Sequence, residues 1–482
     1  MNLINKKSSF YIINIVISII FLFLFSPYTT PLNPYFGYDD NIFMIMGQGI
    51  NKGYIPYKDL FDHKGPMLYF IYAIADLIMH GKMGLFILQL VNLYIINHCI
   101  YRIALLYNCT IKKAYIVLSV FMIFFIGTIG EGAMNEEFSL SFLFISFYLC
   151  LKDIRSVDIK TQPTLLHTFI YGISFAIVFL IRANNAALIC GIILGYTILL
   201  LKEKQYILLL KNVMAFISGV LIISIPLVIY FIKENAFDDF IFCSYTYNYI
   251  YAVDGMQNAR HYIVKIIWIL PTILFFLTTI KYLQLKECFI IIPCLIISLF
   301  SVSLGNAYLH YYTLLLPLIV FFISKLIISI NYKRFFIFSA ICFIPYTYTS
   351  AKNIGKILYF DILRTRDGYC TELEYIYNII PKEYKDRTMP IELTYRDYAL
   401  YSKYNMTPLS RFFFFQNQFM EDIEDASQEL LNNSKNAIPE YILTANINNI
   451  NSIAIRQNIN EKYVLIYQKH DSVLNMEIYK KK

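Results

Sequence analysis

The chain has 482 residues, of which 58% are hydrophobic and only 15% are charged. A soluble globular domain carries about 25% charged residues, so this composition excludes an ordinary soluble enzyme. The formal charge of +8 would suit a nucleic-acid partner on a soluble protein. Here most Lys and Arg residues lie in short segments between apolar blocks, so we expect no nucleic-acid partner.

Apolar blocks of roughly 16–24 residues recur along the chain, and a helix of this length crosses ~30 Å of hydrocarbon. Lipid offers no partner for backbone N–H and C=O groups, so such blocks must be helical. The first block resembles a signal peptide, but prolines follow it instead of a small-residue cleavage pattern, so we expect a retained helix. We predict eleven spanning helices, near residues 10–27, 84–107, 114–130, 137–151, 165–181, 186–201, 212–232, 266–280, 288–304, 311–328 and 335–351.

Residues 66–80 are also apolar, but we predict that they do not span. Fifteen residues reach only ~22 Å, and Asp76 would cost about 3 kcal/mol at mid-bilayer. We therefore expect this helix to lie along the outer interface. The later inner loops then hold twelve Lys and Arg residues and the outer loops four, which places the N-terminus inside.

The segment 352–482 is different, because its charge density is ordinary and it holds short β-like runs at Glu440–Leu443, Tyr463–Tyr467 and Met476–Tyr479. Asp367-Gly368 and Met389-Pro390 are interpreted as turns. We predict two domains. Residues 1–351 form an all-α polytopic membrane domain with a large first outer loop, 28–83, and residues 352–482 form a small extracytoplasmic α/β domain.

The first outer loop carries the most informative polar residues. Asp39 and Asp40 follow the first span by about a dozen residues, and an amphipathic stretch, Ile42–Ile50, comes next. A run punctuated by Gly and Pro then brings Tyr57, Asp62, His63 and Lys64. The punctuation favours a shaped loop over a merely solvated one.

Three further groups follow spans on the predicted outer side. Glu131, Glu136 and Glu137 precede the fourth span, where a carboxylate also suits a helix N-terminus. Arg182 ends the fifth span; Arg binds phosphate bidentately, but an interfacial anchor is the alternative. His310 and Tyr311 precede the tenth span, where an aromatic belt is the alternative. A carboxylate that takes a proton from a hydroxyl, with a cation holding a departing phosphate, would suit glycosyl transfer from a lipid.

These residues resemble the membrane-embedded GT-C glycosyltransferases, especially the bacterial family 39-like branch related to protein O-mannosyltransferases and aminoarabinose transferases. The resemblance covers roughly residues 10–330. It rests on Asp39-Asp40, on "GYIPYKDLFDHKGP", on "NEEFSL", on Arg182 and on "HYYTLLLP". In that family the segment after Lys-Gly-Pro is a juxtamembrane helix, in agreement with the prediction for residues 66–80.

The resemblance implies a sugar donor linked to polyprenyl phosphate. It implies Asp39 as the catalytic base, although the second residue there is commonly Glu, so the choice between Asp39 and Asp40 stays open. Glu136 or Glu137 would be the second acidic residue, and Arg182 and Lys64 would meet the lipid phosphate. We also expect Tyr57, Asp62, His63, His310 and Tyr311 to contribute to donor binding.

No cofactor is certain from the sequence. A divalent cation such as Mg²⁺ or Mn²⁺, held by Asp62 and His63 with Glu136, stays an alternative. No glycine-rich nucleotide loop is present, which fits a lipid-phosphate donor.

We expect transfer to a glycan, lipid or protein acceptor at the outer face of a bacterial cytoplasmic membrane. A transporter or flippase of a lipid-linked saccharide is the alternative, but it would need polar groups at mid-membrane, and few spans here hold charges. A non-catalytic relative that binds a polyprenyl lipid is the third hypothesis.

Overall fold

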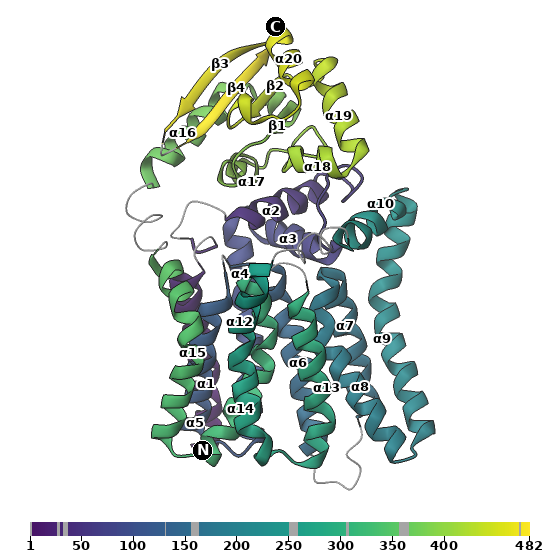
Figure 1. The fold of residues 1–482 in the computed structure, drawn as a ribbon, viewed down its shortest axis with the longest axis vertical. Helices are drawn as coiled ribbons and strands as arrows, with labels where there is room; N and C mark the ends of the chain where they lie inside the picture. Colours follow the sequence, from purple (N-terminus) through teal and green to yellow (C-terminus); the bar gives the residue numbers. More distant parts are fainter. Residues whose placement is uncertain are drawn as a thin grey trace. The chain divides into compact units, whose positions relative to one another are not determined.

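The computed structural model describes residues 2–26, 29–31, 37–130, 132–155, 163–249, 259–304, 308–355, 366–471 and 474–482. The chain divides into two compact units (Figure 1). The first unit comprises Met1–Ser26, Leu88–Lys233 and Ser244–Ile354, and the second comprises Pro27–Ile87, Glu234–Cys243 and Gly355–Lys482.

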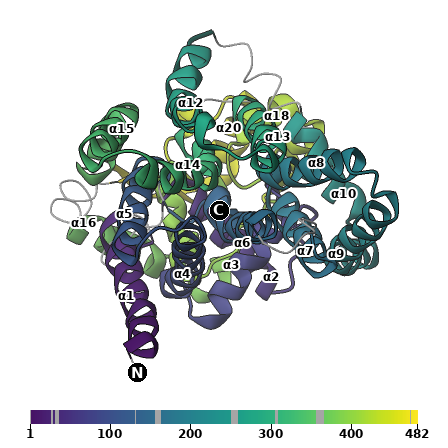
Figure 2. The ribbon, with the colours of Figure 1, turned by 90° about the horizontal axis from the view of Figure 1, so that it is seen from below.

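The first unit is a bundle of long helices, and every predicted spanning segment is helical in it. These helices are α1 (Asn2–Phe25), α4 (Lys82–Leu106), α5 (Ile111–Thr128), α6 (Asn135–Arg155), α7 (Leu165–Ile181), α8 (Ala187–Lys202), α9 (Tyr206–Lys233), α12 (Ala259–Thr279), α13 (Leu285–Ser303), α14 (Leu316–Ser329) and α15 (Tyr332–Gly355). Two short 3-10 helices, η1 (Ala183–Ala186) and η4 (Leu309–Leu315), lead into α8 and α14. The view along the bundle shows α6 among its neighbours α7, α8, α13 and α14 (Figure 2).

The described residues contain seven helices that are long and apolar enough to cross a membrane by length and composition. The apolar parts of α1 and α7 are shorter, and α6 carries charged residues at both ends. The chain is thus a multi-pass membrane protein, while the number eleven stays a prediction.

The helices of the first unit are joined by polar contacts as well as by apolar packing. Asn14 of α1 donates its side-chain amide to the carbonyl of Tyr94 at 3.0 Å, and Asn97 donates to Ser18 at 3.0 Å. Hydrogen bonds of this kind join helices where no water is available. Between α7 and α9 a Cβ on Gly172 would overlap the carbonyl oxygen of Phe216, so only glycine permits this close approach.

The second unit contains a four-stranded sheet in the order β1-β2-β4-β3. Its strands are β1 (Thr388–Ile391), β2 (Tyr441–Thr444), β3 (Tyr463–His470) and β4 (Asn475–Lys481). β1 and β2 are parallel, whereas β4 pairs antiparallel with both β2 and β3. Its helices are α2 (Tyr38–Asn51), α3 (Pro66–Ile78), α10 (Phe237–Ile241), α16 (Arg366–Ile379), α17 (Ala399–Tyr404), α18 (Gln416–Asp422), α19 (Glu424–Lys435) and α20 (Ile453–Lys462).

The two turn assignments in this unit were wrong. Met389 and Pro390 lie inside β1, which is an edge strand, and an edge tolerates a proline because one side needs no ladder donor. Asp367 and Gly368 lie in the first turn of α16. The three predicted β-like runs correspond to β2, β3 and β4.

Residues of the predicted first outer loop pack with the C-terminal segment. The division of the chain into two units therefore differs from the predicted domain boundary after residue 351. The amide of Gln48 in α2 donates to the carbonyl of Ser402 in α17 at 2.9 Å. Asp76 in α3 is buried and accepts hydrogen bonds from Asn51 at 3.2 Å and from Gln48 at 3.4 Å. At 13 residues α3 is too short to span a bilayer, as predicted, and its carboxylate is satisfied by protein groups.

Candidate functional site

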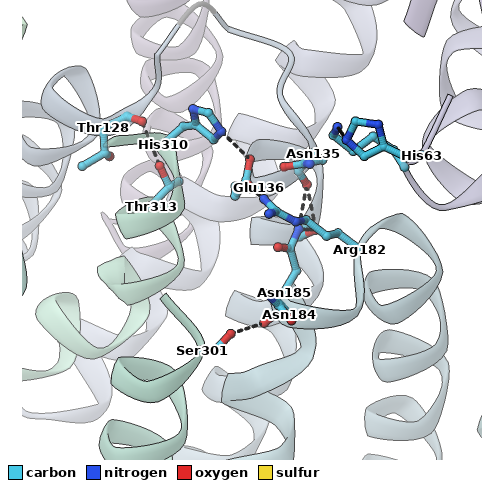
Figure 3. Close-up of polar contacts among 12 residues, drawn as sticks. His63, Thr128, Asn135, Glu136, Arg182, Asn184, Asn185, Ser301, His310 and Thr313 are labelled. Carbon is cyan, nitrogen blue, oxygen red and sulfur yellow. Dashed lines mark hydrogen bonds and ion pairs between the residues drawn. The ribbon is translucent and has the colours of Figure 1, made fainter. Parts of the chain in front are cut away.

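In the first unit three predicted residues from separate segments meet. Arg182 follows α7, and its Nη1 lies 2.8 Å from Oε1 of Glu136 at the start of α6. The Nε2 atom of His310, in η4, lies 4.0 Å from the other Glu136 oxygen (Figure 3). Glu136 is 1% exposed, whereas Arg182 and His310 keep about a fifth of their side chains exposed. The carboxylate of Glu136 is thus buried, and the side chains of Arg182 and His310 form the exposed part of the cluster.

Tyr311 completes this Arg182–Glu136–His310 cluster. The Arg182 guanidinium lies 4.1 Å from the centre of the Tyr311 ring, and the His310 ring meets the same tyrosine edge to face at 4.8 Å. A cation over an aromatic face is stabilised by the ring quadrupole, and a guanidinium has five N–H donors. Arg182 is therefore held in place by Glu136 and Tyr311.

The backbone around the cluster is fixed by contacts between helix ends. Thr313 donates its hydroxyl to the carbonyl of Thr128 at 3.0 Å, which joins η4 to the end of α5. Asn185 donates to Ser139 at 2.9 Å, and Ser301 donates to the carbonyl of Asn184 at 2.7 Å (Figure 3). The ends of five elements are thus held at fixed distances around Arg182.

Glu137 does not face this cluster. Its carboxylate accepts two hydrogen bonds from the Gln89 amide at 3.0 and 3.1 Å and one from the Ala133 N–H at 2.7 Å. Ala133 has a left-handed φ of 55°, an unusual conformation for a residue with a Cβ. Glu137 therefore stabilises the turn before α6, and of the two predicted glutamates only Glu136 pairs with Arg182. Glu131 lies outside the described residues.

In the second unit Asp39 and Asp40 form the first turn of α2, after Gly37. Asp39 is half-buried, whereas Asp40 is fully buried and neither of its carboxylate oxygens has a described hydrogen-bond partner. Burial raises the pKa of Asp40 from 3.8 to about 7, and the backbone at Gly37 and the charge of Lys82 oppose the rise. The two neighbouring carboxyls therefore differ, because Asp39 is partly exposed, whereas Asp40 is buried and its raised pKa leaves it partly protonated at neutral pH.

The loop before α3 is held in an unusual shape by Tyr57. This fully buried residue has a left-handed φ of 71°. Its N–H donates to the carbonyl of Leu60 at 2.8 Å and its hydroxyl donates to the carbonyl of Lys64 at 2.7 Å. A strained conformation persists only when its surroundings fix it, so the loop presents Asp62, His63 and Lys64 in one arrangement.

Asp62 is buried and accepts hydrogen bonds from the Tyr69 hydroxyl at 2.8 Å and the His63 N–H at 2.7 Å. Burial raises the pKa of Asp62, Lys64 opposes the rise, and the negative charge of Asp39 adds to it. The acid pair and the Asp62 loop thus influence one another electrostatically. The Nζ of Lys64 lies 2.7 Å from Nε2 of His63. An ammonium group can only donate, so Nε2 of His63 is the acceptor in this contact.

No group of three His, Cys, Asp or Glu side chains in the described part of the chain could hold a metal ion. The divalent cation expected as an alternative from the sequence stays a prediction.

Comparison with known proteins agrees with this architecture. The solved structure of ArnT from Cupriavidus metallidurans, bound to undecaprenyl phosphate, superposes with a TM-score of 0.63 over 98% of this chain and 98% of that chain, at 9% sequence identity. The chain therefore has the same fold as that structure. An Archaeoglobus fulgidus oligosaccharyltransferase tethered to an acceptor peptide matches 91% of this chain and 69% of its own, at 11% identity and a TM-score of 0.48. No protein-family model and no curated protein matches the sequence.

Sequence reasoning missed the residues that support the predicted ones. Tyr69 holds Asp62, and Gln89 holds Glu137. A glutamine inside an apolar span is itself a signal, because an unpaired amide is costly there. Tyr69 carried no such signal in a chain with 42 tyrosines.

Proposed function

We propose that the chain is an inverting glycosyltransferase that moves a sugar from a polyprenyl-phosphate-linked donor to a glycan, lipid or protein acceptor at the outer face of a bacterial cytoplasmic membrane. The acid pair at the start of α2 carries this proposal. Asp40 is buried without a described hydrogen-bond partner, which is unfavourable for stability, and Asp39 beside it stays accessible. In a chain with the GT-C fold, such an arrangement fits a proton acceptor better than a structural role.

Asp39 is the proposed base. Its carboxylate takes the proton of the acceptor hydroxyl as that oxygen forms a bond to C1 of the sugar. The bond between C1 and the phosphate oxygen breaks, and the electron pair leaves with the polyprenyl phosphate. Attack on the face opposite the phosphate inverts C1. Asp40 is the poorer candidate because its carboxyl is fully buried.

Arg182 is the proposed phosphate-binding residue, because its guanidinium is partly exposed and is held by Glu136 and Tyr311. His310 can add a hydrogen bond from the same surface. Lys64 is a second candidate cation for phosphate, while Tyr57 and Asp62 fix the loop that carries it.

The proposal is tested with purified protein in liposomes and a panel of undecaprenyl-phosphate-linked hexoses and pentoses carrying a labelled sugar. We expect free undecaprenyl phosphate to form with an acceptor extract from envelope membranes, and Asp39→Asn to stop this release. Movement of the intact lipid between leaflets without its cleavage would instead support a flippase.

A further inference from the structure

The C-terminal segment reaches the first turn of α2 through two buried side chains. The Ser402 hydroxyl, in α17, donates to Oδ1 of Asn41 at 2.6 Å. The Nδ2 of Asn41 then donates to the carbonyl of Gly37 at 2.7 Å. Ser402 and Asn41 are both 0% exposed. A continuous chain of hydrogen bonds therefore links α17 to Gly37, the N-cap residue of the helix whose first turn contains Asp39 and Asp40.

This link lies at the N-terminal end of α2. Gly37 supplies no side-chain cap for the helix. Without Ser402, the buried Asn41 oxygen would lose this hydrogen bond, and the loss of a hydrogen bond to a buried acceptor is destabilising. The side chain of Asn41 would then be able to rotate. The carbonyl of Gly37 would lose its hydrogen bond from Asn41, which fixes the backbone at the start of α2.

The same segment also holds the loop that carries Asp62. The N–H of Phe61 donates to the carbonyl of Arg411 at 2.9 Å. The Arg411 guanidinium binds Asp239 at 2.8 Å, and its backbone N–H donates to Glu429 at 2.8 Å. Residues 402–411 thus contact the first loop at Asn41, which follows Asp40, and at Phe61, which precedes Asp62.

We propose that Ser402 and Asn41 are positioning residues for Asp39, so that the C-terminal segment is part of the transfer machinery. This inference rests on the proposed function, because Asp39 is the base in it. Catalysis depends on sub-ångström placement, and a shift of about 1 Å can reduce a rate 10²-fold. Ser402 acts through Asn41, so the two side chains form one connection.

The test uses Ser402→Ala, Asn41→Ala and the double variant in the full-length protein. We expect Ser402→Ala to lower kcat roughly 10- to 100-fold with the KM for the lipid donor little changed. The double variant should be no slower than Asn41→Ala alone, because both substitutions break the same connection. Ser402→Thr, which keeps the hydroxyl, should restore most of the rate.

Lys52→Ala is the matched control. Lys52 lies at the other end of α2. It donates to the carbonyl of Asn405 and, at 2.9 Å, to the hydroxyl of Thr407, so it joins α2 to the same segment away from Asp39. We expect this variant to keep the wild-type kcat.

Hydrogen–deuterium exchange gives a readout that does not depend on transfer. Ser402→Ala should speed amide exchange in residues 38–41 by about 10-fold, and Lys52→Ala should not. A wild-type kcat in Ser402→Ala, or losses that multiply in the double variant, would overturn the inference. If the wild-type protein releases no polyprenyl phosphate, the proposed function fails, and unchanged exchange in Ser402→Ala would refute the connection separately.

Discussion

The Arg182 cluster of the first unit and the acid pair of the second unit differ in the partners of their buried carboxylates. Glu136 is buried against Arg182, with His310 nearby, so its charge is compensated. Asp40 is buried with no described partner for either oxygen. Pairing offsets much of the cost of burying Glu136, whereas burial of Asp40 raises its pKa despite the Gly37 backbone and Lys82, and so lowers stability when that carboxyl ionises. The comparison therefore separates a paired buried carboxylate from one that burial disfavours.

The largest expected effect is on turnover by Asp39→Asn. We expect kcat to fall at least about 10³-fold, because an amide cannot take the acceptor proton. Asp40→Asn should retain more activity than Asp39→Asn. Release of polyprenyl phosphate measures both, and equal rates in the Asp39 variant and the wild type would remove the base from the proposed mechanism.

Asp40→Asn should stabilise the folded protein at alkaline pH. The pKa of Asp40 is raised to about 7 in the folded chain from 3.8, so the unfolded state releases this proton first. The free energy of unfolding should thus fall by up to about 4 kcal/mol between about pH 4 and pH 7 and stay level above that pH.

Thermal unfolding in detergent checks this difference. At pH 8 the Asn variant should melt above the wild type, and near pH 4 the difference should vanish. A wild-type advantage at pH 8 would show that Asp40 has a compensating partner when ionised.

Arg182→Ala should weaken donor binding and stability together. Removal of one partner leaves Glu136 buried without its cation, which costs about 3–5 kcal/mol in a fully buried pair and less here, because Arg182 is 21% exposed. Binding of undecaprenyl phosphate, followed by native mass spectrometry, should fall at least about 10-fold.

Arg182→Ala/Glu136→Ala is the control, because it removes the unpaired charge. It should recover stability without recovering binding. Recovery of lipid binding in the double variant would show that Arg182 has a structural role only.

The smallest expected effect is that of Tyr69→Phe, which removes one hydrogen bond from the buried Asp62. The expected loss of stability is about 1–3 kcal/mol. Unfolding measured in parallel with Tyr375→Phe, an exposed tyrosine of α16, separates the hydroxyl of Tyr69 from a general tyrosine effect.

The sequence predicted all the long helices because apolar block length is set by the bilayer and read directly from the chain. It also grouped Glu136, Arg182 and His310, since loop order places them at one end of the bundle. It could not choose between Glu136 and Glu137, because adjacent helical residues point about 100° apart and only packing sets the rotation. The strand at Thr388–Ile391 was missed because its proline resembles a turn.

The packing of the first loop against the C-terminal segment could also not be predicted from the sequence. Gln48 and Ser402 are 354 residues apart, and neither carries a motif. Contacts at such separation are fixed by tertiary packing, so no local pattern reveals them.

The hydrogen bonds from Ser402 and Arg411 limit how freely homologous pieces can be exchanged. A chimaera joined after residue 355 would retain every described helix of the bundle and yet lose the native partners of Asn41 and Phe61. Exchange of the tail alone to alter acceptor choice should therefore yield inactive proteins. Exchange of residues 27–87 and 234–243 together with the tail would keep these partners matched.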